Sequence, residues 1–281
     1  MMKITTSLVH QYKNYLIDEE KSEVTIEKYV RDISVFYKWL EDRELTKALV
    51  LEYKAKLVNE YSPATVNSVL AALNGFFVYN EWYGLKVKSL KLQRQLFCKT
   101  EKELTKQEYE KLLKAAKSQR NERLNLIMQT ICSTGIRVSE LSYVTVSAVN
   151  QGQAQVKLKG KIRIVFFTKE LCNLLKKYIR EQGIKEGCVF RTRTGKPIDR
   201  HTIWKSMKKL CELAGVSPGK VFPHNLRHLF ARTFYGIQKD IVRLADILGH
   251  SSINTTRVYT IENGDVHRQQ MHLLGLVRMN V

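Results

Sequence analysis

The sequence predicts a mainly α-helical protein of two domains, the second of which contains a small antiparallel β-sheet. Apolar residues recur at helical spacing through most of the chain, but between residues 144 and 167 they alternate with polar ones. A basic stretch without helical period lies between the two regions, just before a new helix start. We therefore expect a helical domain over 1–95, a basic linker over 96–103, and a mixed α/β domain with a C-terminal tail over 104–281.

The first domain is expected to hold four or five helices. One apolar stripe follows a candidate cap at Ser22. A second follows Ser62, where a capping hydroxyl precedes Pro63 at the first helical position. Weaker periodic stretches cover residues 7–20 and 46–60. The aromatic residues of these stripes are interpreted as core.

A basic stretch follows this domain and shows no clear helical period. It contains five cationic residues, Lys86, Lys88, Lys91, Arg94 and Lys99. By itself such a stretch is a solvated linker. In a DNA-binding protein it would cross or follow the phosphate backbone.

The second domain is expected to start near residue 102, because Thr105 and Glu108 form a capping box. Helical patterns run to Cys132, and Gly135 then interrupts the chain. The alternating segment from 144 to 167 has turn residues at 150–152 and 159–160, which predicts a small antiparallel sheet. Helices return from Lys169, with a short strand expected at 188–191.

The net charge points to nucleic acid as the partner. Lys and Arg number 47 against 27 Asp and Glu, which gives a formal charge of +20 and a pI of about 9.7. Such an excess repels itself unless a polyanion neutralises it. A merely solubilising surface or an anionic membrane ligand are the weaker interpretations, since the charge is not confined to one tail.

Cysteine usage and hydropathy favour the cytoplasm. The five cysteines are widely spaced and form no C-x-x-C pair, which favours reduced thiols. The N-terminus has no apolar signal region, and no window approaches the ~18 apolar residues that span a bilayer. We expect a cytoplasmic protein without a membrane partner.

Several cofactor motifs are absent from the sequence. It has no G-x-x-x-x-G-K-[ST] loop and no G-x-G-x-x-G turn, so neither ATP nor a dinucleotide is indicated. No acidic cluster suggests paired divalent metals. His224 and His228 could share a helix face as zinc ligands do, but no third ligand accompanies them. We expect no metal, nucleotide or other cofactor.

The evidence in favour of a particular function comes from basic residues that stand among apolar ones. Pro223 precedes an expected helix start at which His224 and Arg227, three apart, would share one face. A helix N-terminus with a histidine and an arginine suits one phosphate group. Taken alone, H-x-x-R is a weak pattern, and a lone tyrosine in a polar helix is usually just half-buried.

Five segments in order make the pattern specific. They are Thr134–Leu141 (TGIRVSEL), Leu158–Lys161 (LKGK), His224–His228 (HNLRH), Leu248–His250 (LGH) and Val258–Tyr259 (VY). Together they resemble the active-site motifs of the tyrosine recombinase (phage integrase) family, and most closely its two-domain Xer-like members. The resemblance covers residues 104–265, while the first domain is similar to the family's core-binding domain by position and composition. It implies a protein that clamps around DNA.

The resemblance also implies roles for individual residues. Arg137 and Arg227 match the arginines that hold the scissile phosphate, with Glu140 at the acidic position that orients the first. His224 and His250 match the two histidine positions, Tyr259 the nucleophile, and Lys159 the lysine of the β-turn. That turn is shorter than the family's G-K-G-x-x-x-R form, and Lys161 lies two residues away, so both lysines remain open. Expected DNA contacts are Lys86, Lys88, Lys91, Arg94 and Lys161.

The chemistry explains these residue types. A phosphodiester under attack gains charge, which aimed guanidinium groups stabilise. A phenol with a pKa near ~10 must lose its proton as it attacks, and the leaving 5′-oxygen must gain one. His224 is the candidate base and Lys159 the candidate acid. A 3′-phosphotyrosine conserves the energy of the broken bond, so rejoining through a Holliday junction needs neither ATP nor metal.

Two rival functions remain. One is a type IB topoisomerase, which uses similar chemistry but relaxes DNA as a monomer. The other is a DNA-binding regulator in which these active-site motifs are inactive. The expected partners are double-stranded DNA with inverted-repeat core sites and further copies of the chain in a tetramer. An apolar tail follows Tyr259 and could dock on its own domain or on a neighbouring protomer; its residues are Met271, Leu273, Leu274, Leu276 and Val277.

Overall fold

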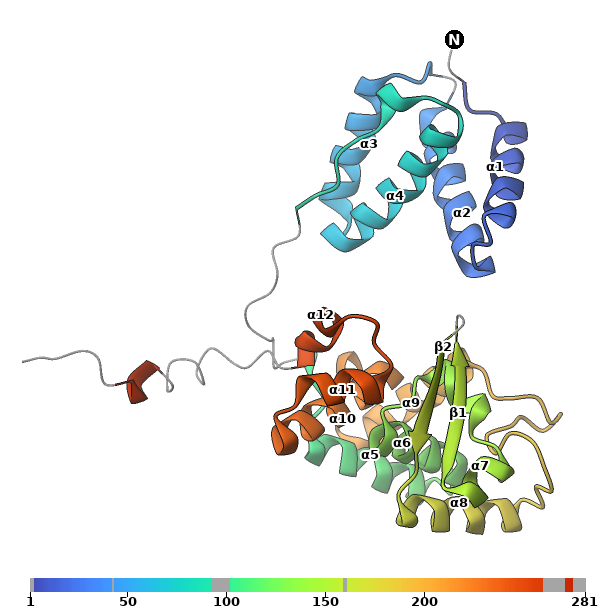
Figure 1. The fold of residues 1–281 in the computed structure, drawn as a ribbon, viewed down its shortest axis with the longest axis vertical. Helices are drawn as coiled ribbons and strands as arrows, with labels where there is room; N and C mark the ends of the chain where they lie inside the picture. The colour runs from blue at the N-terminus through green and yellow to red at the C-terminus, as the bar shows by residue number, and fades with distance from the viewer. Residues whose placement is uncertain (1–2, 42, 92–101, 159–160, 260–270, 275–281) are drawn as a thin grey trace, which may run out of the picture. The chain divides into compact units, whose positions relative to one another are not determined.

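The computed structural model describes residues 3–41, 43–91, 102–158, 161–259 and 271–274. The chain divides into two compact units, one ending at Arg94 and the other beginning at Gln95 (Figure 1). Each unit has a hydrophobic core of its own. The predicted fold class, mainly α with a small antiparallel sheet, is confirmed. Most of the predicted linker lies outside the described residues.

The first unit packs its helices around a core of aromatic and aliphatic side chains that includes Phe36, Phe76 and Phe77. Ser62 caps its helix as expected, with Pro63 in the first turn. Ser22 accepts no backbone N–H in the structure, and its hydroxyl pairs with that of Thr25. The elements of this unit are α1 (Thr6–Asp18), α2 (Glu23–Leu40), α3 (Lys47–Glu60), α4 (Pro63–Tyr79) and η1 (Tyr83–Leu85).

The basic stretch after η1 is anchored to α4. Asn74 pairs with both backbone groups of Val87 at 2.9 Å, and Asn67 pairs with both backbone groups of Leu90 at 2.7 and 2.9 Å. These amide pairs replace the partners that a neighbouring strand would supply. Through Lys91 the stretch is therefore part of the first unit, with Lys86, Lys88 and Lys91 exposed. Arg94 and Lys99 lie outside the described residues.

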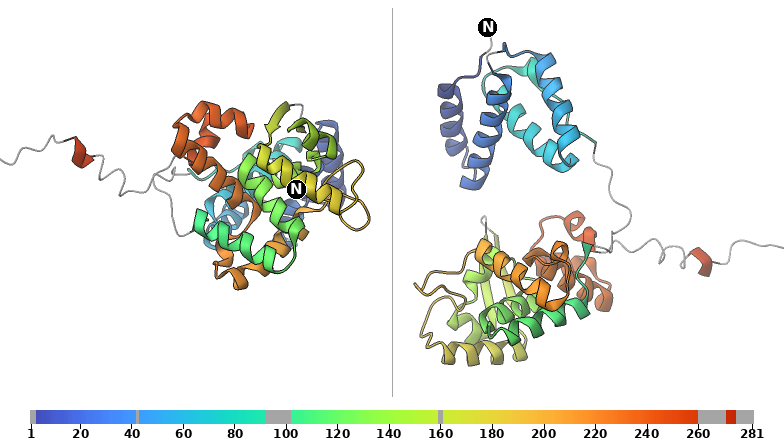
Figure 2. Two further views of the ribbon diagram at one scale, coloured as in Figure 1. Left: turned by 90° about the horizontal axis from the view of Figure 1, so that it is seen from below. Right: turned by 180° about the vertical axis from the view of Figure 1, so that it is seen from behind.

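The second unit is built around α6 (Glu122–Thr134), which packs against α5, α8, α9 and α10. The view from behind in Figure 2 shows α5, in green, beside α9, in orange. The predicted capping box is present in both directions, between Thr105 and Glu108. The other elements are α5 (Lys106–Ser118), η3 (Val138–Tyr143), α7 (Val146–Gln151), β1 (Gln153–Leu158), β2 (Lys161–Phe166), α8 (Lys169–Glu181), α9 (Arg200–Ala214), η4 (Pro218–Lys220), α10 (Pro223–Gln238), α11 (Ile241–Leu248), α12 (Ile253–Thr256) and η5 (Arg257–Tyr259).

The alternating segment forms one antiparallel hairpin, β1–β2, in which Val156 pairs with Arg163 and Leu158 with Lys161. Its first part is helical instead, because the Thr145 side chain caps the N-terminus of α7 and Gly152 ends the helix with φ +73°. The prediction of a strand at 188–191 is wrong. Isolated bridges form there, from Cys188 to Thr145 and from Arg191 to Pro197.

Three of the four apolar residues of β2 face away from the core. Ile162, Ile164 and Phe166 are 58, 47 and 68% exposed, although their alternation correctly indicated a strand. Val165 points inward instead, and Arg163 lies on the same face. On this inner face Arg163 forms an ion pair with the buried carboxylate of Glu140.

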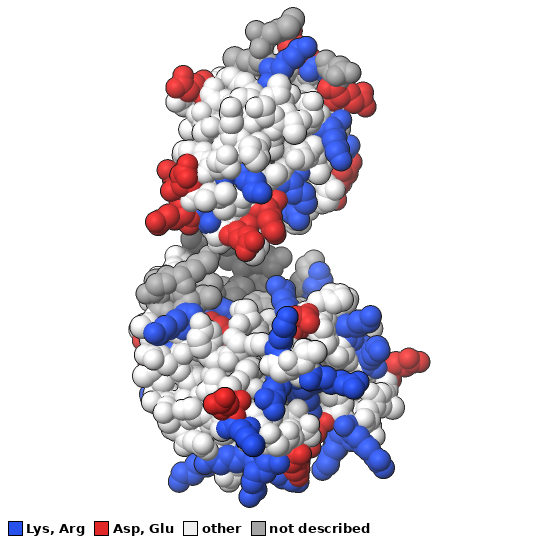
Figure 3. All heavy atoms as spheres, turned by 90° about the vertical axis from the view of Figure 1, so that its right-hand side faces the viewer, with Lys and Arg blue, Asp and Glu red and all other residues white. Residues whose placement is uncertain are grey.

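The positive charge is concentrated in the second unit. Residues 1–94 carry 14 Lys and Arg against 12 Asp and Glu, whereas residues 95–281 carry 33 against 15. Figure 3 shows blue side chains spread over the face of the second unit that is in view, and a more even mixture on the first. Among the described residues, no helix is long and apolar enough to cross a membrane.

Candidate active site

Arg137 is held at the end of α6 by a local turn. Gly135 ends the helix with φ +64°, and a Cβ there would lie 2.5 Å from the Phe230 ring, so glycine is required. The carboxylate of Glu140 accepts from the Arg137 backbone N–H at 2.8 Å and from its Nη1 at 2.9 Å. The arginine is thus fixed by the residue predicted to orient it.

Glu140 is 1% exposed and remains ionised. Burial alone would raise its pKa, but the hydrogen bonds from Arg137 and the positive charge of Arg163 outweigh this effect and lower the pKa overall. The carboxylate therefore stays a charged acceptor between two guanidinium groups.

Arg227 is buried in α10 and bonds to two loops. Its Nη1 donates to the carbonyl of Gly135, and its Nη2 donates to the carbonyl of Leu248 at 2.8 Å and lies 3.1 Å from His250 Nε2. Burial, with the nearby Arg137, lowers the pKa of Arg227 to about 10, so it remains a cation at neutral pH. Arg227 thereby ties the turn before Arg137 to the turn before His250.

Two of the predicted site residues are histidines close to these arginines. His224 stands in the first turn of α10, as predicted, and His250 follows α11, with its Nδ1 2.8 Å from the Thr256 hydroxyl. Partial loss of hydration first, and then neighbouring positive charges, lower the pKa of the exposed His224 and bring that of the half-buried His250 to about 4. Both imidazoles are therefore neutral at pH 7 and can accept a proton.

Tyr259 is 5% exposed and packs against α10 and α11. Its ring lies edge-on to His228, with centroids 4.7 Å apart, and nearly parallel to His250 at 6.0 Å. His228 in turn contacts His224 edge-on at 4.4 Å. The candidate nucleophile is therefore buried in a histidine cluster, and not half-buried as a tyrosine in a polar helix usually is.

The second unit thus brings together Arg137, Glu140, His224, Arg227, His250 and Tyr259. Lys159 lies outside the described residues, as does the Lys161 side chain, although the Lys161 backbone begins β2. Lys86, Lys88 and Lys91 belong to the first unit. The described residues contain no group of three His, Cys, Asp or Glu side chains that could hold a metal.

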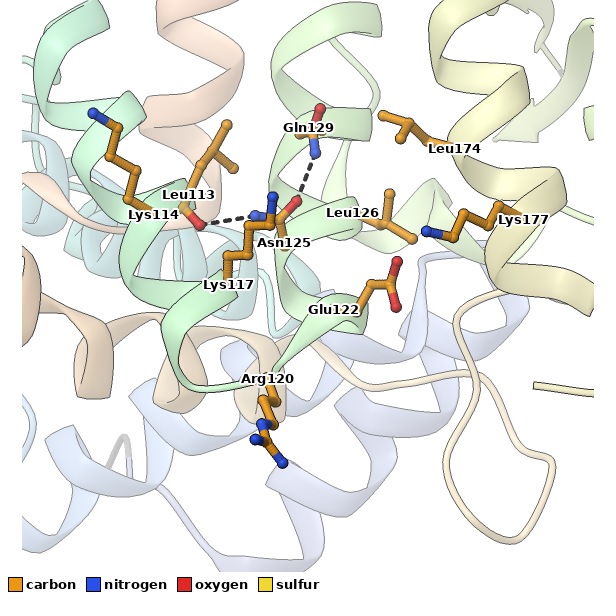
Figure 4. A pocket seen from close by; sticks show the side chains of 10 residues that line it. All are labelled: Leu113, Lys114, Lys117, Arg120, Glu122, Asn125, Leu126, Gln129, Leu174 and Lys177. Carbon is orange, nitrogen blue, oxygen red and sulfur yellow. Dashed lines mark hydrogen bonds between the residues drawn. The ribbon is translucent and has the colours of Figure 1, made fainter. Parts of the chain in front are cut away.

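Two cavities of the second unit differ in chemistry. One of about 350 Å³ is lined by Arg137, His224 and Arg227, together with Arg200 and Trp204 of α9. A larger one of about 600 Å³ lies among α5, α6 and α8 and is lined by leucines, amides and lysines (Figure 4). The larger cavity contains no predicted site residue. We assign the site to the smaller one, because three arginines and a histidine line it.

Sequence reasoning missed two residues of this cluster. His228 was considered as a possible zinc ligand, but its ring contacts His224 and Tyr259. Arg163 was given no role from the sequence, but its side chain lies on the core side of the hairpin. One signal was available in the sequence. Arg163 is two residues from the apolar Val165, so both lie on the same face of a strand, and Val165 is buried in the structure.

Two family models match the chain, one in each unit. The model described as "Phage integrase family" matches residues 102–264, and the one described as "Phage integrase, N-terminal SAM-like domain" matches residues 9–84. The chain belongs to the phage integrase family. The predicted membership and the predicted enzyme class, a tyrosine-type site-specific recombinase, are thereby confirmed.

Relatives match over most of the chain. Tyrosine recombinase XerA of Pyrococcus furiosus is 29% identical over 266 residues, which cover 92% of this chain and 90% of the relative. The structure of a XerH site-specific recombinase bound to palindromic difH substrate has a TM-score of 0.72 at 21% identity and covers 97% of this chain and 84% of that one. A lambda integrase tetramer bound to a Holliday junction has a TM-score of 0.73 at 19% identity, with coverage of 90% and 76%. At these identities the two structures show the shared fold.

The half-buried His228 and His250 predict a pH-dependent stability. Burial first, and then His224 and Arg227, lower the pKa of His228 to about 4, as happens at His250. The unfolded chain takes up these protons near pH 6.5, whereas the folded chain does not. The stability that they affect is therefore full above pH 6.5 and falls towards pH 4.

We expect the unfolding temperature of His228→Phe to fall less between pH 6.5 and pH 4 than that of the wild type. The exposed His201 provides the control, because His201→Gln should keep the wild-type pH dependence. Equal slopes for all three proteins would contradict the prediction.

Proposed function

We propose that the chain cuts and rejoins double-stranded DNA at a specific site through a covalent bond between Tyr259 and a 3′-phosphate. The observation that carries this proposal is the convergence of Arg137, Arg227 and His224 on one cavity, with Tyr259 packed in the adjoining histidine cluster. Two fixed guanidinium groups can neutralise the non-bridging oxygens of one phosphate as charge develops in the transition state.

The proposed proton transfers use neutral and cationic groups in turn. His224 is neutral at pH 7 and would accept the phenolic proton of Tyr259, and His250 would hydrogen-bond the phosphate beside Arg227. Lys159 would protonate the leaving 5′-oxygen. Rejoining reverses these transfers when a 5′-hydroxyl attacks the phosphotyrosine, so no ATP or metal enters the reaction.

The proposed partner is duplex DNA with inverted-repeat core sites, held by a tetramer of the chain. The related structures support this, since a XerH recombinase was solved with its difH substrate and a lambda integrase tetramer with a Holliday junction. The charge of the second unit provides the attraction to phosphates. Lys86, Lys88 and Lys91, exposed on an anchored segment, would add backbone contacts from the first unit, and the two units would clamp the duplex.

The proposal can be tested on a target site selected from random DNA. Duplexes would be selected by binding from a random pool, and a nicked version of the selected site would then be incubated with protein in EDTA. We expect a covalent adduct that resists denaturant and contains Tyr259 in the modified peptide. A protein that binds but never forms an adduct would be a regulator. One that relaxes supercoiled DNA lacking the selected site would be a topoisomerase.

The C-terminal tail offers a test of assembly. Met271, Leu273 and Leu274 are exposed in the described segment, whereas Leu276 and Val277 lie outside it. If the tail docks on a neighbouring protomer, deleting the chain from Val266 should preserve binding of a single protomer but abolish pairing of two DNA segments. Gel-shift assays with half-site and full-site duplexes would measure both steps. Normal recombination by the truncated chain would show that the tail does not dock in this way.

A further inference from the structure

Arg163 is a charged residue on the inner face of the β1–β2 hairpin. Its side chain is 13% exposed, and it lies on the same face of β2 as the buried Val165. The guanidinium Nη2 donates to Glu140 Oε2 at 2.5 Å, and Nη1 donates to the carbonyl of Ile247 at 2.6 Å. Both terminal nitrogens are therefore engaged with protein groups rather than pointed at solvent.

The first partner links Arg163 to the phosphate-binding arginine. Glu140 accepts from Arg163 on Oε2 and from the Arg137 guanidinium on Oε1. A buried carboxylate with one partner removed is costly, because the remaining charge is poorly compensated. With both guanidinium groups in place, the carboxylate is fixed and so is Arg137.

The second partner links Arg163 to the turn that carries His250. Ile247 lies one residue before Leu248, whose carbonyl accepts from Arg227. Gly249 follows with φ +64°, and a Cβ at this position would collide with the Cδ of Arg163. The aliphatic part of Arg163 is thus packed against the turn that its guanidinium also bonds.

We propose that Arg163 is a positioning residue that aligns three segments of the site: the hairpin, η3 with Arg137, and the end of α11 with His250. Its two diverging N–H donors reach Glu140 and the Ile247 carbonyl together, which one ammonium group does less well. Arg163 acts through these neighbours and does not itself bind the phosphate. This inference rests on the proposed function, since it assigns Arg163 to the geometry of phosphate cleavage.

The test compares adduct formation on two forms of the selected nicked duplex. In the first the scissile phosphate is unmodified, and in the second a methylphosphonate replaces it, which removes the negative charge that Arg137 neutralises. We expect Arg163→Met to form adduct about 100-fold more slowly than wild type on the phosphate and within about tenfold of wild type on the methylphosphonate. Arg137→Ala should show the same rescue. Arg163→Lys should form adduct about tenfold more slowly than wild type on the phosphate, because lysine keeps the positive charge but lacks the two diverging N–H donors of the guanidinium group.

Controls separate positioning from folding. Lys176→Met removes an exposed cation of α8 and should leave both rates unchanged. A loss in Arg163→Met that is equal on both substrates would show a merely structural role and overturn the inference, as would a rate within threefold of wild type on the phosphate. If Arg163→Met does not fold, Arg163→Lys is judged by the same comparison of substrates. A wild type that forms no adduct would instead refute the proposed function.

Discussion

Tyr259→Phe is expected to form no covalent adduct while binding the selected duplex with an affinity within about twofold of wild type. The phenolic oxygen is the proposed nucleophile, and phenylalanine lacks it. The ring itself is packed between His228 and His250, and phenylalanine preserves those contacts. Binding depends instead on cations, so the affinity of both proteins should fall steeply as salt rises.

Tyr235→Phe is the matched control for this experiment. Tyr235 lies in α10, packs against the same small core, and has Lys239 over its ring. Removing its hydroxyl should leave both binding and adduct formation close to wild type. If Tyr259→Phe loses DNA binding, Tyr259 has a structural role in the DNA-bound state that its buried position would explain, and the assignment as nucleophile alone would be wrong.

Lys159→Ala is expected to be nearly inactive on ordinary DNA and largely restored on DNA whose scissile 5′-bridging oxygen is replaced by sulfur. An alkoxide leaves poorly without a proton, whereas a thiolate leaves readily, because thiol pKa values lie near ~8.5. The rate of adduct formation by Lys159→Ala is therefore expected to be about 100-fold or more below wild type on the oxygen substrate, and less than about tenfold below it on the sulfur substrate. The measurement is the rate of adduct formation on both duplexes.

Parallel variants locate the general acid. Arg137→Ala and Arg227→Ala should not be rescued by sulfur, because the charge that they stabilise is on the non-bridging oxygens. If Lys159 is the acid, sulfur should not rescue Lys161→Ala, because any loss of rate from removing this expected DNA contact would be equal on both substrates. Rescue of Lys161→Ala instead would move the assignment by two residues, across a turn whose ends, Leu158 and Lys161, pair in the hairpin. With no rescue in either variant, His224 would be the next residue to test.

Local signals account for most of the fold that was predicted. Helix starts at Thr105 and Ser62 depend on hydrogen bonds within three residues, so they are readable from the sequence. The helical segment at 146–151 was missed because a capping threonine and a terminal glycine outweighed a short apolar pattern. Cys188 forms an isolated bridge with Thr145, 43 residues earlier, which no local pattern predicts.

By itself the sequence determined the type of chemistry, because the segments that contain Arg137, His224, Arg227, His250 and Tyr259 resemble the active-site motifs of the tyrosine recombinase family. The tertiary structure decided how those side chains are held. A period of two identifies a strand but leaves open which face is buried. In the folded chain Arg163 lies on the inner face and pairs with Glu140, while Ile164 faces out. The contact between His228 and Tyr259 likewise joins residues 31 positions apart. Burial and charge pairing act across such distances, so they are fixed only when the chain is folded.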